Sequence, residues 1–308
     1  MKILVTGGAG YIGTCLVPML LERGEDVTVV DKLMFGSAGL LPCFAYPNFH
    51  FVRGDITDEE TLKKCLRGKD FIVHLAAYVG YPICKKFPKE ARATNLEGSI
   101  LLNKIRGETP LLFGSTGSNY GVVTDKVCTE ETPLNPVTLY GETKTLAEAA
   151  FRKAGNIVCY RFATAFGVAP RLRLDLLVND FCYRAVRLKS LIVYEAGFKR
   201  TFIHVRDIGK SFIFAIDNYG RMKNEIYNVG SDSMNYTKAE IAEKIKTKTD
   251  YYMHFADVGK DEDQRNYEVS YEKISRLGFQ TTIDLDRGLD ELIEVMQAID
   301  IQNPYSNV

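Results

Sequence analysis

Short apolar runs, each followed by a turn and then by a longer amphipathic segment, repeat along the first half of the chain. Runs rich in Val, Ile and Leu predict buried strands, and the periodic segments between them predict helices. Strands that alternate with helices pair into a parallel sheet, so the pattern predicts an α/β fold with a doubly wound sheet. The predicted strands are residues 2–6, 27–30, 49–52, 71–75, 111–113 and 157–162, and the predicted helices are 11–23, one that begins at Asp58, 88–106 and 138–153.

The pattern changes after residue 167, where short strands and amphipathic helices no longer alternate regularly. A chain of 308 residues is long enough for two domains. We therefore assign residues 1–168 and 201–230 to the sheet domain, and residues 169–200 and 231–308 to a smaller mixed α/β lobe. Beyond residue 167 the sequence predicts a long helix over 171–189, short strands at 192–193 and 202–205, and helices over 207–218, 237–246 and 285–298.

Three glycines follow the first predicted strand at three-residue spacing: Gly7, Gly10 and Gly13. Without Cβ atoms they allow a tight turn, a close approach to a pyrophosphate, and close packing of the next helix on the strand. The helix that follows offers unpaired N–H groups to an anion. A glycine-rich turn without a ligand is the alternative, but the second predicted strand ends on an acidic residue, Asp31, as a dinucleotide site requires. The sheet domain is therefore expected to bind a nicotinamide dinucleotide.

Asp31 indicates which dinucleotide is bound. A carboxylate at this position can accept hydrogen bonds from the adenosine ribose diol and repels a 2′-phosphate, so we expect NAD rather than NADP. The neighbouring Lys32 leaves NADP open, because a cation beside the acid could reach a phosphate.

Tyr140 and Lys144 are one turn apart on one face of a predicted helix. A free phenol has a pKa of about 10, and a nearby ammonium lowers it, so that Tyr140 could serve as a general base. A surface Tyr/Lys pair is the alternative, which the predicted nicotinamide site on the same sheet disfavours. Thr116 follows the fifth predicted strand and could hydrogen-bond the same substrate oxygen, with Ser115 and Ser118 as its nearest competitors.

These motifs together resemble the extended short-chain dehydrogenase/reductase family, whose members act mostly on sugar nucleotides. The resemblance spans nearly the whole chain. The residues that carry it are Gly7, Gly10, Gly13, Asp31, Gly54, Asp55, His74, Leu75, Ala76, Ala77, Asn95, Thr116, Tyr140, Lys144 and Arg161.

The resemblance implies roles for individual residues. Tyr140, Lys144 and Thr116 would be catalytic, and a nucleoside-diphosphate sugar would be the substrate. In this family the Arg200 position holds the nucleotide diphosphate. The implied substrate contacts are Val79, Ser118, Asn179, Arg200 and Arg265, and the implied NAD contacts are Gly7, Gly10, Tyr11, Ile12, Gly13, Asp31, Lys32, Asp55, Ile56, Leu75, Ala76, Ala77 and Lys144.

Two departures narrow the expected reaction. Family members that eliminate water carry an Asp-Glu pair directly after the active hydroxyl, whereas Gly117 and Ser118 follow Thr116 here. Residues 77–85 and 170–181 are most similar to the GDP-heptose 4-dehydrogenase branch of bacterial capsule pathways. The leading expectation is therefore NAD-dependent oxidation at carbon 4 of GDP-heptose. An NAD-dependent 4-epimerase of a UDP-, GDP- or dTDP-sugar is the alternative, and a non-catalytic NAD-sensing regulator is a third possibility that the intact Tyr/Lys pair disfavours.

Composition excludes several other classes of protein. Lys plus Arg equals Asp plus Glu at 39 each, so no net charge attracts nucleic acid or an anionic membrane. Seven widely spaced cysteines indicate reduced thiols in the cytoplasm, and the scattered histidines predict no metal site. We expect no membrane span. In enzymes of this family, helices matching 90–106 and 138–153 pair across a two-fold axis, which implies a homodimer.

Overall fold

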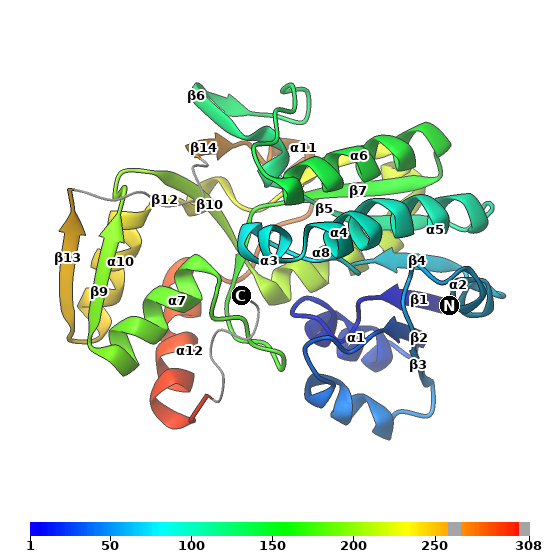
Figure 1. Ribbon diagram of the computed structural model, residues 1–308, viewed down its shortest axis with the longest axis horizontal. Coiled ribbons are helices and arrows are strands. Elements are labelled where there is room, and N and C mark those ends of the chain that lie inside the picture. Colours follow the sequence, from blue (N-terminus) through cyan, green and yellow to red (C-terminus); the bar gives the residue numbers. More distant parts are fainter. Residues whose placement is uncertain (258–265, 302–308) are drawn as a thin grey trace.

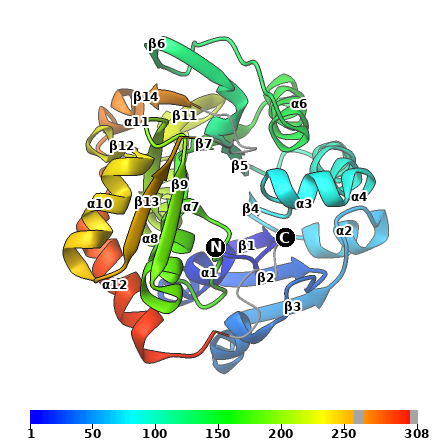
Figure 2. The ribbon, with the colours of Figure 1, turned by 60° about the vertical axis from the view of Figure 1, so that its left-hand side comes forward.

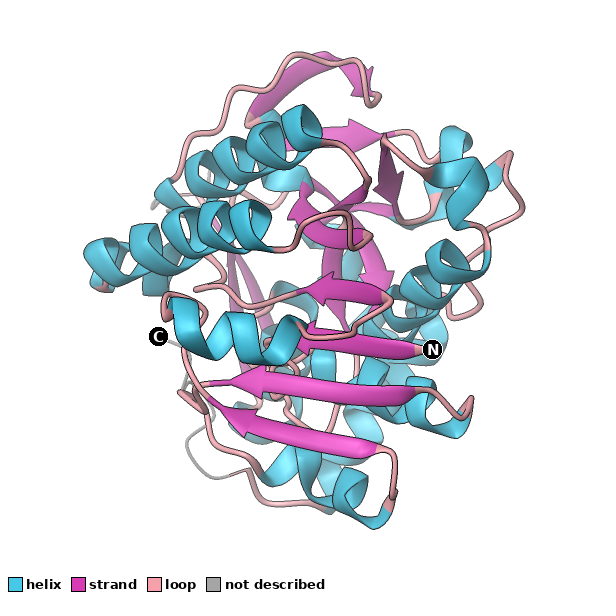
Figure 3. Cartoon of the chain, turned by 90° about the vertical axis from the view of Figure 1, so that its right-hand side faces the viewer, coloured by secondary structure: helices cyan, strands magenta, loops and turns pink. Residues whose placement is uncertain are grey.

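A seven-stranded parallel sheet forms the centre of the computed structural model, which describes residues 1–257 and 266–301 (Figure 1). The strand order is β11-β7-β5-β4-β1-β2-β3, which is a doubly wound Rossmann arrangement. Figure 3 shows strands of this sheet side by side next to the N-terminus. The seven strands are β1 (Lys2–Thr6), β2 (Asp26–Asp31), β3 (Phe49–Arg53), β4 (Phe71–His74), β5 (Leu111–Thr116), β7 (Ile157–Phe162) and β11 (Glu225–Val229).

Helices cover both faces of this sheet, as buried parallel strands require. On one face α1 (Gly13–Glu22) packs against α8 (Val205–Asp217) over a core that includes Val5 and Val29. On the other face α2 (Glu59–Leu66), α5 (Ser99–Ile105) and α6 (Leu139–Ala154) cover a second core. The remaining elements on the sheet side of the chain are the 3-10 helices η1 (Ala38–Ala45) and η3 (Gly117–Tyr120), the helices α3 (Tyr81–Lys86), α4 (Pro88–Arg92) and α9 (Tyr219–Met222), and the π-helical turn η2 (Ala93–Gly98).

A further hydrophobic core, called the lobe core, lies beside the sheet and is built mainly from the second half of the chain (Figure 2). It packs α7 (Leu177–Tyr183), α10 (Lys238–Lys248) and α12 (Leu285–Ala298) against short strands. The division into two domains at residues 168, 200 and 230 stays a prediction. The other elements are η4 (Arg184–Leu188), η5 (Asp232–Met234), α11 (Glu272–Ser275), β6 (Val122–Cys128), β8 (Thr164–Phe166), β9 (Ser190–Tyr194), β10 (Lys199–His204), β12 (Asn235–Thr237), β13 (Tyr252–Ala256) and β14 (Asn266–Val269), which form the small sheets β12-β10-β8, β13-β9 and β14-β6.

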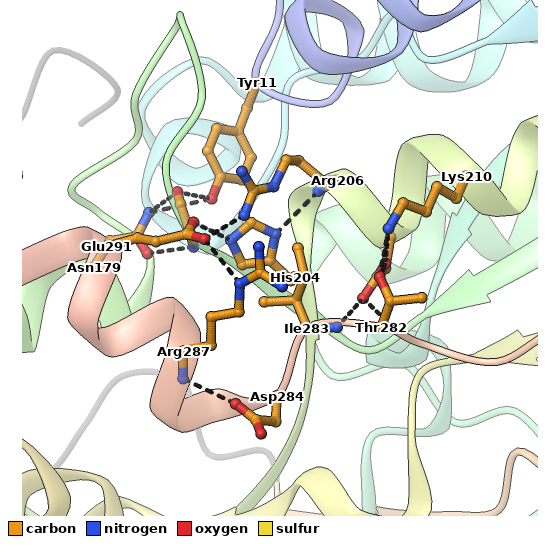
Figure 4. Close-up of polar contacts among 12 residues, drawn as sticks. Tyr11, Asn179, His204, Arg206, Lys210, Thr282, Ile283, Asp284, Arg287 and Glu291 are labelled. Atoms are coloured by element: carbon orange, nitrogen blue, oxygen red, sulfur yellow. Dashed lines mark hydrogen bonds and ion pairs between the residues drawn. The ribbon is translucent and has the colours of Figure 1, made fainter.

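Polar contacts fix the lobe core against the sheet domain. The buried Asp207 carboxylate at the start of α8 accepts hydrogen bonds from the backbone N–H groups of Thr282 and Ile283, both at 2.9 Å. Arg206 forms an ion pair with Glu291 of α12 (Figure 4). The start of α12 is thereby held against α8.

The long helix predicted over residues 171–189 is wrong in its first part. Residues 171–176 are not helical, and α7 begins only at Leu177. The sequence Arg171-Leu172-Arg173-Leu174-Asp175-Leu176 alternates with a period of two, which is typical of extended chain rather than helix. The sequence analysis also missed the seventh strand, β11. Of the helices in the described residues, none is long and apolar enough to cross a bilayer.

Candidate active site

The glycine turn between β1 and α1 leaves no room for side chains. A Cβ atom on Gly7, whose φ is +75°, would lie 2.6 Å from the backbone nitrogen of Ala76. A Cβ on Gly13 would lie 2.5 Å from Gly8 Cα, so this glycine lets α1 start directly on the turn. A Cβ atom on Gly10 would meet only the carbonyl oxygen of Gly7, and Gly10 lines a cavity. A dinucleotide fingerprint needs such a cradle for its pyrophosphate.

Asp31 ends β2 at one end of this cavity, which we call the adenosine end; Lys32, Asp55 and Ile56 also line it. The two carboxylate oxygens of Asp31 accept hydrogen bonds from the backbone nitrogens of Ala9 (3.0 Å) and Leu33 (2.7 Å). Burial raises the pKa of Asp31, although these hydrogen bonds act in the opposite direction. The carboxylate is therefore held in one orientation towards the cavity.

Lys32 points to Asp55 and Tyr78 rather than to Asp31. Its ammonium lies 3.4 Å from an Asp55 oxygen and 3.2 Å from the Tyr78 hydroxyl. Burial would raise the pKa of Asp55, but hydrogen bonds from Thr57 and the Lys32 charge outweigh it and lower that pKa. The Lys32 ammonium, although it is next to Asp31 in the sequence, is thus paired with the carboxylate of Asp55.

Tyr140 and Lys144 stand in the first two turns of α6 and line the same cavity at its other end, which we call the catalytic end. The Thr138 hydroxyl caps α6 by accepting a hydrogen bond from the Gly141 nitrogen at 3.1 Å. Thr116, the last residue of β5, lines this end as well. The three predicted catalytic residues are therefore brought together by β5 and α6.

The Lys144 side chain is only 3% exposed, and its ammonium lies 3.9 Å from the centre of the Phe113 ring. Burial lowers the pKa of Lys144 to about 7, despite the opposing effect of Cys159 and Glu148. A buried cation next to Tyr140 is the arrangement that favours a phenolate.

Thr116 is held by its own turn. Its hydroxyl accepts a hydrogen bond from the Ser118 nitrogen (3.1 Å) and donates one to the Ser118 hydroxyl (3.0 Å). The preceding residue, Ser115, donates to Glu148 at 2.7 Å, and Glu148 forms a buried ion pair with Arg161 at 2.6 Å. This network ties the end of β5 to α6 and β7 beneath the catalytic residues.

His74 is a core residue, as expected from its place at the end of a buried strand. Its two ring nitrogens are hydrogen-bonded to Thr6 (2.7 Å) and Ser99 (2.9 Å). Burial, together with the charge of Lys144, lowers its pKa to about 3. A histidine in this state has no proton acceptor available for substrate.

All thirteen predicted NAD contacts line the cavity, as do Val79 and Ser118 among the predicted substrate contacts. Asn179 and Arg200 do not line it. Asn179 is fully buried, and its amide bonds to the backbone of Gly167 and Arg173. Arg200 is buried in β10 and donates to the carbonyl of Lys199. Arg265 lies outside the described residues.

Several residues that line the cavity were not among the predicted site residues, and they include Phe35, Tyr78, Arg171 and Arg173. The two arginines belong to the segment that was predicted as helix. Their period-two alternation with leucines was the signal that could have found them, because it places both arginines on one face of an extended segment.

The residues around the cavity fit NAD. The glycine turn is a cradle that Cβ atoms would fill, Asp31 offers fixed acceptors for a ribose diol, and the small residues Ala76 and Ala77 leave backbone accessible. Lys144 lines the catalytic end of the same cavity, and its contact with ribose hydroxyls stays a prediction.

Comparisons with known proteins bear on the family of this chain. A family model described as "NAD dependent epimerase/dehydratase family" matches residues 3–230. A UDP-glucose 4-epimerase from Lactobacillus helveticus is 30% identical over 81% of this chain and 82% of its own length.

Two solved structures share the fold over nearly the whole chain. The UDP-glucose 4-epimerase of Thermus thermophilus, in complex with NAD, superposes with a TM-score of 0.83 at 24% identity, covering 97% of this chain and 99% of that one. A dTDP-glucose 4,6-dehydratase from Streptomyces venezuelae, with NAD and TYD bound, superposes with a TM-score of 0.85 at 26% identity, covering 97% and 98%.

Proposed function

Because this chain belongs to the NAD dependent epimerase/dehydratase family, we propose that it oxidises carbon 4 of a nucleoside-diphosphate sugar and reduces it again as a 4-epimerase. Membership of an NAD-dependent enzyme family confirms the predictions of an enzyme and of NAD as its cofactor. The observation that carries the proposed reaction is the meeting of Tyr140, Lys144 and Thr116 in the cavity that begins at the glycine turn.

Each catalytic residue has one task in this proposal. NAD, when bound, supplies the hydride acceptor. Tyr140, as a phenolate, takes the proton of the sugar 4-hydroxyl, and the buried charge of Lys144 stabilises that phenolate. The Thr116 hydroxyl turns its proton from the Ser118 hydroxyl to the same oxygen as it becomes a carbonyl, while the Ser118 nitrogen keeps Thr116 in place. Epimerisation requires the keto sugar to rotate so that hydride returns to the opposite face of carbon 4, while Tyr140 gives the proton back to the oxygen.

The cavity does not favour dehydration. Among the described residues, the carboxylates that line the cavity are Asp31 and Asp55, and both are at the adenosine end. Gly117 and Ser118 follow Thr116, so this turn supplies no acid that could expel a sugar hydroxyl.

A 4-dehydrogenase of GDP-heptose, which the sequence analysis favoured, is now the second candidate. The relatives reported above are named for UDP-glucose and dTDP-glucose, which supports the epimerase alternative better. One observation still favours the dehydrogenase: residues 77–85 and 170–181, which carried that resemblance, both contribute to the cavity wall through Val79, Arg171 and Arg173.

Incubation with single sugar nucleotides separates the two reactions. The protein is mixed with NAD and with UDP-glucose, dTDP-glucose or a GDP-sugar, and products are followed by proton NMR and NADH absorbance. An epimerase gives a mixture of C4 epimers without net NADH, whereas a dehydrogenase gives a 4-keto sugar and one NADH per sugar. A protein that binds NAD and converts none of these sugars would contradict the proposal.

Assembly and substrate contacts remain parts of the proposal. We propose that Val79 and Ser118, which line the cavity, contact the substrate, and that a homodimer is the working form. The substrate contacts of Asn179, Arg200 and Arg265 stay predictions. A reducing compartment such as the cytoplasm suits the seven cysteines, all of which are buried free thiols.

A further inference from the structure

An extended segment crosses from the lobe core to the cavity between β8 and α7. This segment, residues 167–176, is called the strap. Arg171, Arg173 and Leu176 of the strap line the cavity, while Leu174 is buried in the lobe core. The strap therefore places Arg171 and Arg173 in the wall of the cavity, on a segment separate from the glycine turn.

Hydrogen bonds hold both ends of the strap. The Tyr11 hydroxyl, at the start of α1, donates to the Gly167 carbonyl at 2.6 Å. The Asn179 side chain accepts from the Gly167 nitrogen at 2.9 Å and donates to the Arg173 carbonyl at 2.8 Å. The Arg171 nitrogen donates to the Thr14 hydroxyl at 3.3 Å. Because the strap is fixed to α1 and α7, its arginines are positioned before any ligand binds.

Arg171 belongs to the adenosine end. Its guanidinium lies 4.3 Å from the centre of the Phe35 ring, and Phe35 itself lines the cavity after β2. Burial and the charge of Arg173 lower the pKa of Arg171 to about 10, and the negative charges of Asp175 and Asp31 act against this. Arg171 is therefore a cation at neutral pH, stacked on an aromatic ring and within the electrostatic reach of the ribose carboxylate.

Arg173 has a different environment at the catalytic end. Its guanidinium is clamped by Asp175 and donates to the Val79 carbonyl at 3.2 Å. The charge of Asp175 acts on Arg171 as well, as does that of Asp31. Arg171 is the arginine that lies beside Phe35 at the adenosine end, so it is the one placed to meet an anionic part of a ligand there.

We propose that Arg171 is a cofactor-binding residue, which holds the adenosine diphosphate half of NAD from the strap while Phe35 supports its guanidinium. A planar guanidinium matches phosphate oxygens with parallel N–H donors, and stacking on a ring fixes its plane. The cofactor is then held by the glycine turn and by the strap together. This role depends only on NAD as the cofactor and not on which sugar is the substrate.

Calorimetric titration with ADP-ribose tests the proposal without any turnover. Arg171→Ala is expected to weaken ADP-ribose about tenfold or more, which is the scale for losing a charge-assisted hydrogen bond. Arg171→Lys keeps the charge but not the fork, so it should recover part of the affinity. Arg184→Ala removes another cation of the same region, which pairs with Asp180 outside the cavity, and should bind ADP-ribose as the native protein does.

A second substitution separates binding from folding. Phe35→Leu removes the ring but leaves the strap intact, and it should weaken ADP-ribose binding less than Arg171→Ala does. The double variant Phe35→Leu with Arg171→Ala should lose less binding free energy than the two single variants lose together. Native ADP-ribose affinity in a folded Arg171→Ala protein would overturn the proposal. So would equal weakening in Arg184→Ala, or an Arg171→Lys variant that binds no better than Arg171→Ala while melting at the native temperature.

Discussion

The ammonium of Lys144 lies over the ring of Phe113, 3.9 Å from its centre, so that β5 supplies an aromatic floor for the buried cation of α6. A cation–π contact offsets only part of the free energy of removing an ammonium from water. Burial accordingly lowers the pKa of Lys144 from its ordinary 10.5 to about 7. The residue that activates Tyr140 is therefore expected to destabilise the fold.

Lys144→Met should make the cofactor-free protein more stable at low pH. Below about pH 7 the native protein holds a buried charge, and the full penalty applies. Between about pH 7 and 10.5 the unfolded chain keeps a proton that the folded chain has released, so native stability rises with pH and the variant's advantage shrinks. Denaturant unfolding should show a larger advantage at about pH 6 than at about pH 9, where only part of it remains, and the two advantages should differ by a few kcal/mol in order of magnitude.

The exposed Lys104→Met on α5 is the control for this experiment, because it removes a lysine that is already in water. Its stability difference from the native protein should not change between the two pH values. An advantage of Lys144→Met that stays constant with pH would contradict the assigned titration. The same Lys144→Met variant should lose activity and bind NAD more weakly.

Tyr140→Phe should leave cofactor and sugar-nucleotide binding intact and lower kcat by about a hundredfold to ten-thousandfold, the usual scale for a general base. Thr116→Ser should keep most activity, because a serine hydroxyl can still accept from the Ser118 nitrogen and donate to substrate. Thr116→Val loses both hydrogen bonds, so its kcat should lie between those of Thr116→Ser and Tyr140→Phe. The exposed Tyr252→Phe serves as control. A Tyr140→Phe variant with the native kcat at any pH would exclude Tyr140 as the general base.

The sequence predicted the elements whose pattern is local. The Gly7, Gly10 and Gly13 spacing, the acid at the end of β2, and the Tyr140/Lys144 pair each depend on one strand-turn-helix unit, and the structure brings them to one cavity. Helix α12 was predicted at the bounds that the structure has, Leu285–Ala298, because its apolar stripe is regular.

The strap offered only one local signal, the period-two alternation of its arginines and leucines, and the rest of what holds it extended is not local. Its hydrogen bonds connect residues far apart in the sequence, such as Tyr11 with Gly167 and Thr14 with Arg171. These tertiary bonds hold an Arg/Leu-rich segment extended although its residue types favour a helix. β11 was missed for a related reason, since the run Ile226 to Val229 is short and becomes a strand by pairing with β7.

A homodimer through α5 and α6 is expected, because both helices carry apolar side chains on their exposed faces. Ile100 on α5 is 47% exposed and Leu146 on α6 is 43% exposed, and the two helices pack side by side (Figure 1). Light scattering should give about twice the monomer mass of 34.6 kDa. Ile100→Glu with Leu146→Glu should give monomers, whereas Leu188→Glu, at an exposed position on η4, should not. A native protein that scatters as a monomer would contradict the dimer.

Asp31→Ala should change which cofactor binds. The native carboxylate is fixed by Ala9 and Leu33 and lines the adenosine end, so the native protein should bind NAD more tightly than NADP in calorimetric titrations. Removal of this carboxylate leaves Lys32 and Arg171 as cations at that end, and a 2′-phosphate is then attracted rather than repelled. NADP affinity should therefore rise while NAD affinity falls, so that the difference between the two affinities becomes smaller or changes sign.

Asp26→Ala is the control, because it removes a carboxylate from the other end of β2. It should leave the preference for NAD over NADP unchanged, and circular dichroism should confirm that both variants fold. Equal affinity of the native protein for NAD and NADP would contradict the role of Asp31. If Asp31→Ala still prefers NAD as strongly as the native protein does, the shape of the cavity and not Asp31 selects the cofactor.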